Sequence, residues 1–165
     1  NNHVKQFDRL IDSYKNSKLF NQNIPLYILG EGPDRQLLEY QIKSLELENH
    51  VKLLGLKTNA LAYMNCAKFL ILSSQFEGFP LVLLEALSVG TPVVSFDCHS
   101  GPSEIIDNKS NGLLVESQNF EALTKAMNLL FTDEDLYKKC QSKAINSIEK
   151  FSSSSILPKW LDLLQ

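Results

Sequence analysis

Residues 69–96 read FLILSSQFEGFPLVLLEALSVGTPVVSF, and this stretch decides the fold that the sequence predicts. Its first four residues form an apolar run that is short enough for a buried strand. A polar loop over residues 73–80 follows, and then apolar residues at helical spacing up to Gly90, a residue type that commonly ends a helix. The run at 92–96 is again strand-like. Strand, helix and strand in this order predict neighbouring parallel strands.

The same alternation extends in both directions from this stretch. Further apolar runs predict strands at 26–29, 50–54 and 112–115. Helical spacing predicts helices over 4–19, 33–45, 59–65, 122–130, 136–148 and 156–164, with Pro33 as a first helical residue and the serines at 152–155 as a polar break. We therefore expect an α/β fold in one domain, a Rossmann-like doubly wound parallel sheet with helices on both faces.

The first predicted element is a helix, at residues 4–19. A doubly wound unit normally opens on a strand, and that strand lies in the middle of the sheet. We therefore expect this sequence to lack the first central strand of its domain and to be cut from a longer protein.

Charge and composition exclude several classes of protein. Lys and Arg number 16 and Asp and Glu number 19, so the net charge of −3 argues against binding to nucleic acid or to an anionic membrane through a basic surface. No apolar run approaches the ~20 residues of a membrane span, and because no basic-then-apolar leader is visible we expect no signal peptide in this sequence. The three cysteines are widely spaced, so we expect buried, reduced thiols in a cytoplasmic protein rather than disulfides or a zinc site.

The loop at residues 73–80 is the richest candidate for a binding site. In open α/β sheets, ligands bind beyond the carboxyl ends of the strands. Gly78 allows a ligand close to the backbone, and the start of the next helix favours an anion such as phosphate. Glu77 and Glu85 flank this point, and their carboxylates suit sugar hydroxyls, which are good hydrogen-bond donors.

The spacing of these two glutamates is a weak signal by itself. Glu31 and Glu39 repeat it, and both Glu77 and Glu85 have an alternative interpretation as ordinary solvated residues. The Asp-Glu-Asp sequence at 133–135 matches a metal-binding D-x-D pattern, but it follows Thr132 where a helix is expected to start, and acidic residues are favoured there. We expect no metal site.

A family resemblance adds to these observations. The segment SSQFEGFPLVLLEALSVGTPVVSFD (73–97) resembles the signature of glycosyltransferase family four, which comprises retaining enzymes of the GT-B fold. The resemblance continues in LYILGEGPDRQLLE (26–39), VKLLGLKTN (51–59) and GPSEIIDNKSNGLLV (101–115). It covers nearly the whole chain and implies the C-terminal, nucleotide-sugar-binding half of such an enzyme, so that residues 1–165 are a single donor-binding domain. It also implies that 156–164 is a terminal helix that crosses to the other half.

The resemblance implies two catalytic residues. Glu77 faces the donor sugar, and Lys5 neutralises the diphosphate as it leaves. Lys5 lies in VKQFDRLI (4–11), which is similar to a family pattern K-G-F-D-x-L-I in which Gln6 here replaces glycine. Among donor-binding residues, Glu85 binds the ribose. The other implied donor-binding residues are Gly78, Phe79, Leu81 and Val82 through their backbone amides, Pro80 through the shape of the loop, Leu56 at the base, and Gly30 and Gly32 beside the nucleotide.

The implied function is transfer of a sugar from a nucleoside diphosphate, without a metal or other cofactor. We expect UDP, with GDP and ADP left open, and an acceptor that is a glycan or lipid-linked molecule in bacterial surface polysaccharide or glycoconjugate synthesis. A missing N-terminal domain would bind that acceptor, so the fragment alone is expected to be an inactive hexosyltransferase half. We expect a cytoplasmic location, with the inner face of the membrane left open for the full-length protein. A sugar-nucleotide epimerase half and a non-catalytic nucleotide-binding module are the alternatives.

Overall fold

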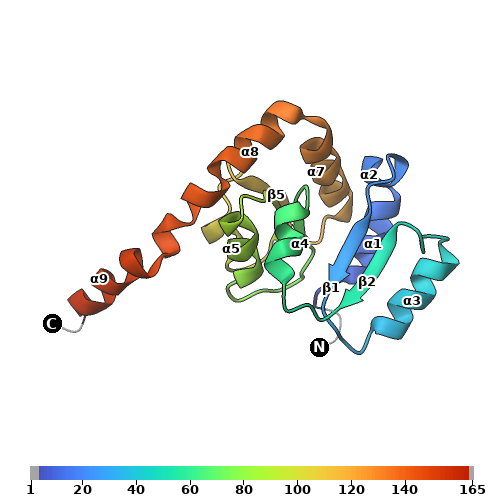
Figure 1. Ribbon diagram of the computed structural model, residues 1–165, viewed down its shortest axis with the longest axis horizontal. Helices are drawn as coiled ribbons and strands as arrows, with labels where there is room; N and C mark the ends of the chain where they lie inside the picture. Colours follow the sequence, from blue (N-terminus) through green and yellow to red (C-terminus); the bar gives the residue numbers. More distant parts are fainter. Residues whose placement is uncertain (1–3, 164–165) are drawn as a thin grey trace.

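A computed structural model describes residues 4–163, in which helices and parallel strands alternate along the chain (Figure 1). The described elements are, in chain order, α1 (Phe7–Lys15), α2 (Lys18–Asn21), β1 (Leu26–Leu29), α3 (Arg35–Ser44), β2 (Val51–Gly55), α4 (Ala60–Cys66), β3 (Leu70–Leu72), α5 (Leu81–Ser88), β4 (Val93–Asp97), α6 (Pro102–Ile105), β5 (Gly112–Glu116), α7 (Phe120–Thr132), α8 (Glu134–Ser147), a 3-10 turn (Glu149–Phe151) and α9 (Ser153–Leu163).

All strand pairs in the described residues are parallel. β1 pairs with β2, and β4 lies between β3 and β5 in a second group. Each strand coincides with a predicted apolar run to within one or two residues. The predicted Rossmann-like α/β fold is therefore confirmed.

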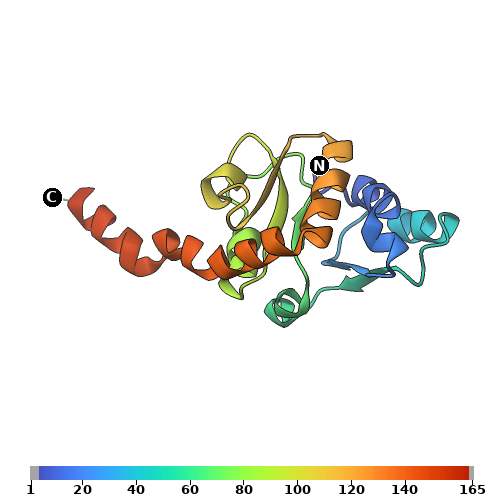
Figure 2. The same ribbon diagram turned by 90° about the horizontal axis from the view of Figure 1, so that it is seen from above.

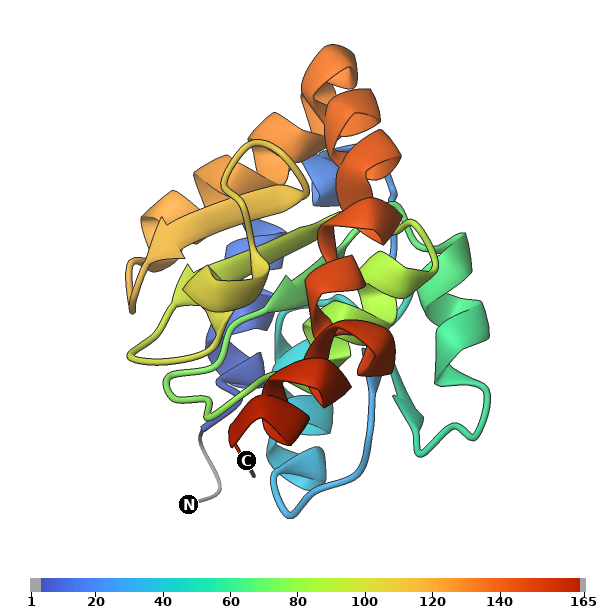
Figure 3. The same ribbon diagram turned by 90° about the vertical axis from the view of Figure 1, so that its left-hand side faces the viewer.

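The hydrophobic core lies on both faces of the sheet, because successive side chains of β4 are buried in two different clusters. Val94 and Phe96 are fully buried in a cluster with residues of α1 and α7. Val93 points the other way because successive side chains of a strand face opposite sides, and it is buried with Leu83 and Leu87 of α5. Helices accordingly flank the strands on both sides (Figure 3).

β1 and β3 are not paired with each other in the described part of the chain. A cavity of about 460 Å³ lies between them, lined by residues of both strands and by Leu10 and Tyr14 of α1. This is where the first central strand of a doubly wound sheet belongs. The arrangement agrees with the prediction that this sequence lacks that strand.

Several predicted boundaries are wrong, and a local hydrogen bond explains the first of them. The helix expected over 4–19 is two helices, because the Ser17 hydroxyl accepts from the Phe20 N–H and starts α2. Pro33 lies in the turn before α3 and is not its first residue, which is Arg35. The predicted break over residues 152–155 is limited to Ser152, because α9 already begins at Ser153.

Two further expectations concern single residues. The Asp-Glu-Asp sequence is a helix start, as expected, but the capping residue is Asp133, whose carboxylate accepts from the Leu136 N–H at 2.9 Å. All three cysteines are free, and Cys98 and Cys140 are buried. Cys66 is exposed, contrary to the prediction, because it ends α4 on the surface.

The C-terminal helix α9 extends away from the sheets, beyond the end of α8 (Figures 1 and 2). Leu157, Trp160 and Leu161 on it are more than half exposed. The predicted crossover segment 156–164 falls within α9 except for its last residue, which lies outside the described residues, and the crossover stays a prediction. Between residues 4 and 163, no helix combines the length and the apolar character needed to cross a bilayer.

Gly112 offers a test of how tightly the strands pack. A methyl group there would collide with the carbonyl oxygen of Val93 and would lie 2.6 Å from its Cγ2. We expect Gly112→Ala to lower the free energy of unfolding by roughly 1–3 kcal/mol in urea titrations, because the strand cannot yield without losing its pairing. Gly32→Ala is the control, since its methyl group meets open space. Equal stability of the two variants would contradict this packing.

Tyr14 gives a pH-dependent test. Burial raises the pKa of this phenol to about 12, and its hydroxyl donates to the Ile24 carbonyl at 2.7 Å. Between pH 10 and 12 the unfolded chain loses the proton first, so the native state should lose up to about 3 kcal/mol of stability in this window. Tyr14→Phe should remove that part of the alkaline loss, whereas Tyr40→Phe, at an exposed tyrosine, should not. Parallel stability curves for wild type and Tyr14→Phe would contradict it.

Candidate functional site

A cavity of about 560 Å³ lies at the carboxyl end of β1. Lys5, Gly30, Gly32 and Leu53 all contribute to its lining, together with the first turns of α1 and α3. The volume is in the range of small-molecule sites, and the position beyond strand ends is the one expected for a ligand in this fold. Three of the predicted site residues, Lys5, Gly30 and Gly32, are thus brought together here.

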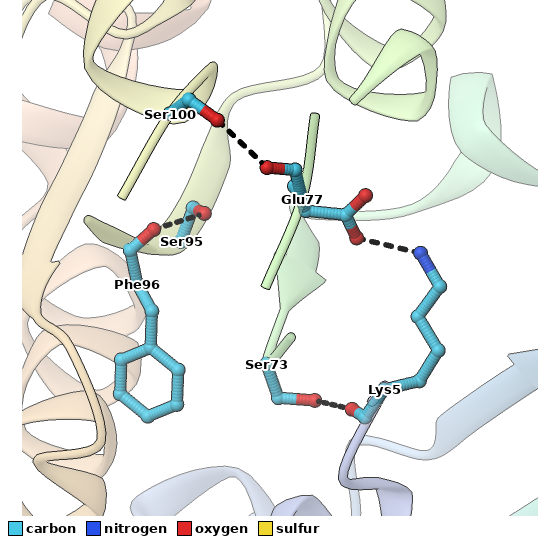
Figure 4. Close-up of polar contacts among 6 residues, drawn as sticks. All are labelled: Lys5, Ser73, Glu77, Ser95, Phe96 and Ser100. Atoms are coloured by element: carbon cyan, nitrogen blue, oxygen red, sulfur yellow. Dashed lines mark hydrogen bonds and ion pairs between the residues drawn. The ribbon is translucent and has the colours of Figure 1, made fainter. Parts of the chain in front are cut away.

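Main-chain contacts fix the position of Lys5. Its carbonyl accepts a hydrogen bond of 2.7 Å from the Ser73 hydroxyl, just after β3 (Figure 4). The preceding carbonyl, of Val4, accepts from the Gln75 N–H at 2.8 Å. The N-terminal segment therefore lies against the carboxyl end of β3 while Lys5 also faces the cavity beside β1. The carboxyl ends of the two groups of strands meet at this point.

Gln6 occupies the position where the family resemblance predicts glycine, and the backbone explains that expectation. Its φ is 52°, in the left-handed region that glycine adopts without strain. Its side-chain amide pairs reciprocally with that of Gln118, at 2.8 and 3.0 Å. Two amide hydrogen bonds thus hold the turn that directly follows Lys5.

Lys5 and Glu77 form an ion pair. The lysine Nζ lies 2.6 Å from a carboxylate oxygen of Glu77, although the residues are 72 positions apart in the sequence (Figure 4). The Glu77 side chain is 13% exposed and that of Lys5 is 50% exposed, so the lysine is open to solvent on one side. The two predicted catalytic residues are therefore in direct contact.

The main chain of Glu77 contacts the loop that follows β4. The Ser100 hydroxyl donates to the Glu77 carbonyl at 2.9 Å. The buried Cys98 thiol lies beside the same residue: burial raises its pKa, and a hydrogen bond from the Glu77 backbone partly offsets that rise. The carboxylate of Glu77 is left facing Lys5.

The remaining predicted donor-binding residues surround this point without lining the cavity beside β1. Gly78, Phe79 and Pro80 continue the Glu77 loop, and Phe79 packs edge-on against Phe151 at 5.5 Å between ring centres. Leu81 is exposed at the start of α5, and Val82 lines the other cavity, between β1 and β3.

Glu85 and Leu56 lie further out. Glu85 is on the solvent side of α5, opposite its buried residues Ala86 and Leu87. Leu56 is 78% exposed directly after the left-handed Gly55. Their exposure is compatible with ligand contacts, but neither touches the Lys5–Glu77 pair in any described contact.

Sequence reasoning missed Arg35. Its guanidinium lines the same cavity as Lys5 and lies 2.7 Å from a Glu31 oxygen and 2.9 Å from a Glu39 oxygen. It also donates to the Leu53 carbonyl at 3.3 Å, which ties the start of α3 to β2. The signal was present, because Glu31, Arg35 and Glu39 follow each other at intervals of four residues, a spacing at which opposite charges pair along a helix. Arg35 and Glu39 share a face of α3, and Glu31 lies in the segment before it.

Comparison with known proteins places the chain in a family. A model of the family "Glycosyl transferases group 1" matches residues 2–147. The chain belongs to this glycosyl transferase family. The matched range contains the whole candidate site, from Lys5 to the loop after β4.

Individual relatives agree with this family. The amylovoran biosynthesis glycosyltransferase AmsD of Erwinia amylovora is 33% identical over 160 residues, which cover 97% of this chain and 44% of that protein. The poly(ribitol-phosphate) alpha-N-acetylglucosaminyltransferase of Staphylococcus aureus (strain COL) is 34% identical over 161 residues, 97% of this chain and 33% of that protein. The chain thus spans less than half the length of these relatives.

Solved structures of glycosyltransferases share the fold. TarM has a TM-score of 0.88 at 33% identity, over 97% of this chain and 32% of its own. The lipopolysaccharide outer core galactosyltransferase WaaB has a TM-score of 0.85 at 25% identity, over 98% of this chain and 45% of its own. The chain therefore has the fold of the C-terminal half of GT-B glycosyltransferases.

The ion pair can be tested for a structural role. Because Lys5 is half exposed, the pair should contribute less than about 1 kcal/mol to stability. We expect Lys5→Ala and Glu77→Gln each to change the free energy of unfolding by no more than that in urea titrations. Lys138→Ala, which breaks an ion pair of 2.8 Å on α8, is the control for a lysine far from the cavity. A loss above about 2 kcal/mol for Lys5→Ala would show that the pair serves stability.

Proposed function

We propose that the chain is the donor-binding half of a retaining glycosyltransferase of family four, which transfers a hexose-type sugar from a nucleoside diphosphate, UDP, to an acceptor. The observation that carries the proposal is the Lys5–Glu77 pair of 2.6 Å beside the glycine-containing cavity at the strand ends. A cation suits a diphosphate, and an adjacent carboxylate suits the hydroxyls of the attached sugar.

The leaving group determines what the site must do. When the bond between the sugar and the diphosphate breaks, negative charge accumulates on the phosphate oxygens. Lys5 neutralises it from one side, and the first N–H groups of α5, which lack partners within the helix, face it from the Gly78–Pro80 loop. These protein groups stabilise the departing charge without a metal, so we propose metal-independent transfer.

The carboxylates have separate roles in this proposal. The Glu77 side chain is only 13% exposed and lies beside Lys5. Its carboxylate accepts hydrogen bonds from hydroxyls of the donor sugar as positive charge develops on the sugar ring. Glu85, exposed on α5, accepts from the ribose hydroxyls. Leu56 and the backbone around Gly30 and Gly32 contact the rest of the nucleotide. Lys5 and Glu77 satisfy each other's charge in this structure, and in the proposal the bound donor replaces that contact.

The choice of UDP and of retention draws on the relatives. A structure of S. aureus TarM, 33% identical with a TM-score of 0.89, contains UDP. The Bacillus subtilis (strain 168) relative, 34% identical over 154 residues, is a poly(glycerol-phosphate) alpha-glucosyltransferase. Common UDP-hexoses carry the diphosphate in the α configuration, so an α-linked product requires retention. The names of the poly(ribitol-phosphate) and poly(glycerol-phosphate) relatives support a polymeric acceptor. We propose that a second domain binds an acceptor of the bacterial surface-polymer type and that transfer takes place on the cytoplasmic side.

Thermal melting with nucleotides tests the proposal. UDP at a hundred times its dissociation constant should raise the free energy of unfolding by about 2.7 kcal/mol. GDP, ADP and inorganic pyrophosphate should give smaller shifts, because they lack the matching base or the ribose. Glu85→Ala should lose most of the UDP shift, since the ribose hydroxyls lose their acceptor.

Glu48→Ala, at an exposed glutamate in the turn before β2, is the matched control and should keep the full UDP shift. No shift with any of the nucleotides would contradict the proposal, as would a Glu85→Ala variant that responds to UDP like wild type.

A further inference from the structure

Ser100 lies in the loop between β4 and α6, 23 positions after Glu77. Its hydroxyl donates to the carbonyl oxygen of Glu77 at 2.9 Å, while the Glu77 carboxylate faces Lys5 (Figure 4). The serine therefore holds the main chain of Glu77 and leaves the charged group free. A hydrogen bond to the carbonyl oxygen fixes the backbone position of Glu77 and leaves its carboxylate able to bind a ligand.

The neighbouring glycine shows how closely the two loops approach. Gly101 is buried and has a φ of +93°. A methyl group there would lie 2.5 Å from the Cδ of Pro80 and 2.8 Å from the carbonyl oxygen of Gly78. Only glycine fits both the backbone conformation and the space, so the loop after β4 packs directly against the loop that carries Glu77.

A second residue of the same loop also lies beside Glu77. Cys98 is 2% exposed, and burial raises the pKa of its thiol, a rise that the Glu77 backbone partly offsets. The loop after β4 therefore meets Glu77 at two of its residues, Cys98 and Ser100.

That loop is anchored to the most constrained strand of the structure. β4 has parallel partners on both sides, β3 and β5, and its residues Val93, Val94 and Phe96 are fully buried. The loop leaves the end of β4 at Asp97 and enters α6 at Pro102, so it spans only four residues. A four-residue connection between a buried strand and a helix can adopt few backbone conformations. We therefore expect the loop to hold the Glu77 main chain in one position.

We propose that Ser100 is a positioning residue for Glu77: its hydroxyl, with Gly101 packed behind the loop, sets the place from which the Glu77 carboxylate reaches the donor sugar. This inference rests on the proposed function of Glu77. Displacements of about 1 Å are enough to weaken a directed contact strongly. Loss of the hydroxyl should therefore affect recognition of the sugar more than recognition of the nucleotide.

Calorimetric binding of UDP and of UDP-glucose, UDP-galactose and UDP-N-acetylglucosamine to the purified protein tests this. For the sugar nucleotide that binds most tightly to wild type, Ser100→Ala should weaken binding about tenfold, and binding of UDP itself should change less than twofold. Ser100→Thr, which keeps the hydroxyl, should restore the wild-type ratio of the two affinities. Ser142→Ala is the matched control, because that hydroxyl also donates to a carbonyl at 2.9 Å but lies on α8.

Two further measurements separate failure of this inference from failure of the proposed function. Ser100→Ala should have no additional effect on sugar-nucleotide binding in a Glu77→Ala background, because the two residues act as one unit. It should also speed hydrogen exchange of the amides at 77–79 at least tenfold, a readout that needs no ligand. Unchanged exchange, or an equal loss for UDP and UDP-sugar, overturns the positioning role. Faster exchange combined with a Glu77→Ala variant that binds the sugar nucleotide normally overturns the role of Glu77 instead.

Discussion

The contact between Lys5 and Glu77 is the constraint on which the candidate site depends. It joins residues 72 positions apart, and it forms only if the N-terminal segment lies across the carboxyl end of β3. Hydrogen bonds to its main chain hold the segment there, and the carboxyl ends of the two groups of parallel strands meet at this point. The cavity beside β1, the Glu77 loop and the start of α5 then face the same space, which is what a ligand as long as a sugar nucleotide needs.

The chain holds both members of this pair by their backbones. Ser73 donates to the Lys5 carbonyl and Ser100 to the Glu77 carbonyl, and neither hydroxyl touches a charged group (Figure 4). The ammonium group of Lys5 and the carboxylate of Glu77 therefore start from fixed backbone positions, and their described ion pair is with each other. A half-exposed ion pair costs little to open, because water and a ligand can replace each partner. Such a pair is suited to exchange its internal contact for a bound diphosphate and sugar.

The local pattern of apolar residues was sufficient to predict the strands, but it did not predict the contacts between loops. The runs at 26–29 and 69–72 are apolar and short, and burial in a parallel sheet requires that pattern. The split of the first helix at Ser17 depends on one capping hydrogen bond, which no periodicity reveals. The family resemblance implied that Lys5 and Glu77 belong to one site, but it predicted neither their ion pair nor the hydrogen bond from Ser100 to Glu77, because contacts between loops leave no repeating signal in the sequence.

The structure of the chain with a bound UDP-sugar is the most direct test of this account. It predicts that the Lys5–Glu77 pair is open, with the Lys5 Nζ about 2.8 Å from a diphosphate oxygen and the Glu77 carboxylate within hydrogen-bond distance of a sugar hydroxyl. The Glu77 carbonyl should still accept the hydrogen bond from the Ser100 hydroxyl. A nucleotide bound elsewhere, with the ion pair still closed at 2.6 Å, would contradict the claim that this pair marks the donor site.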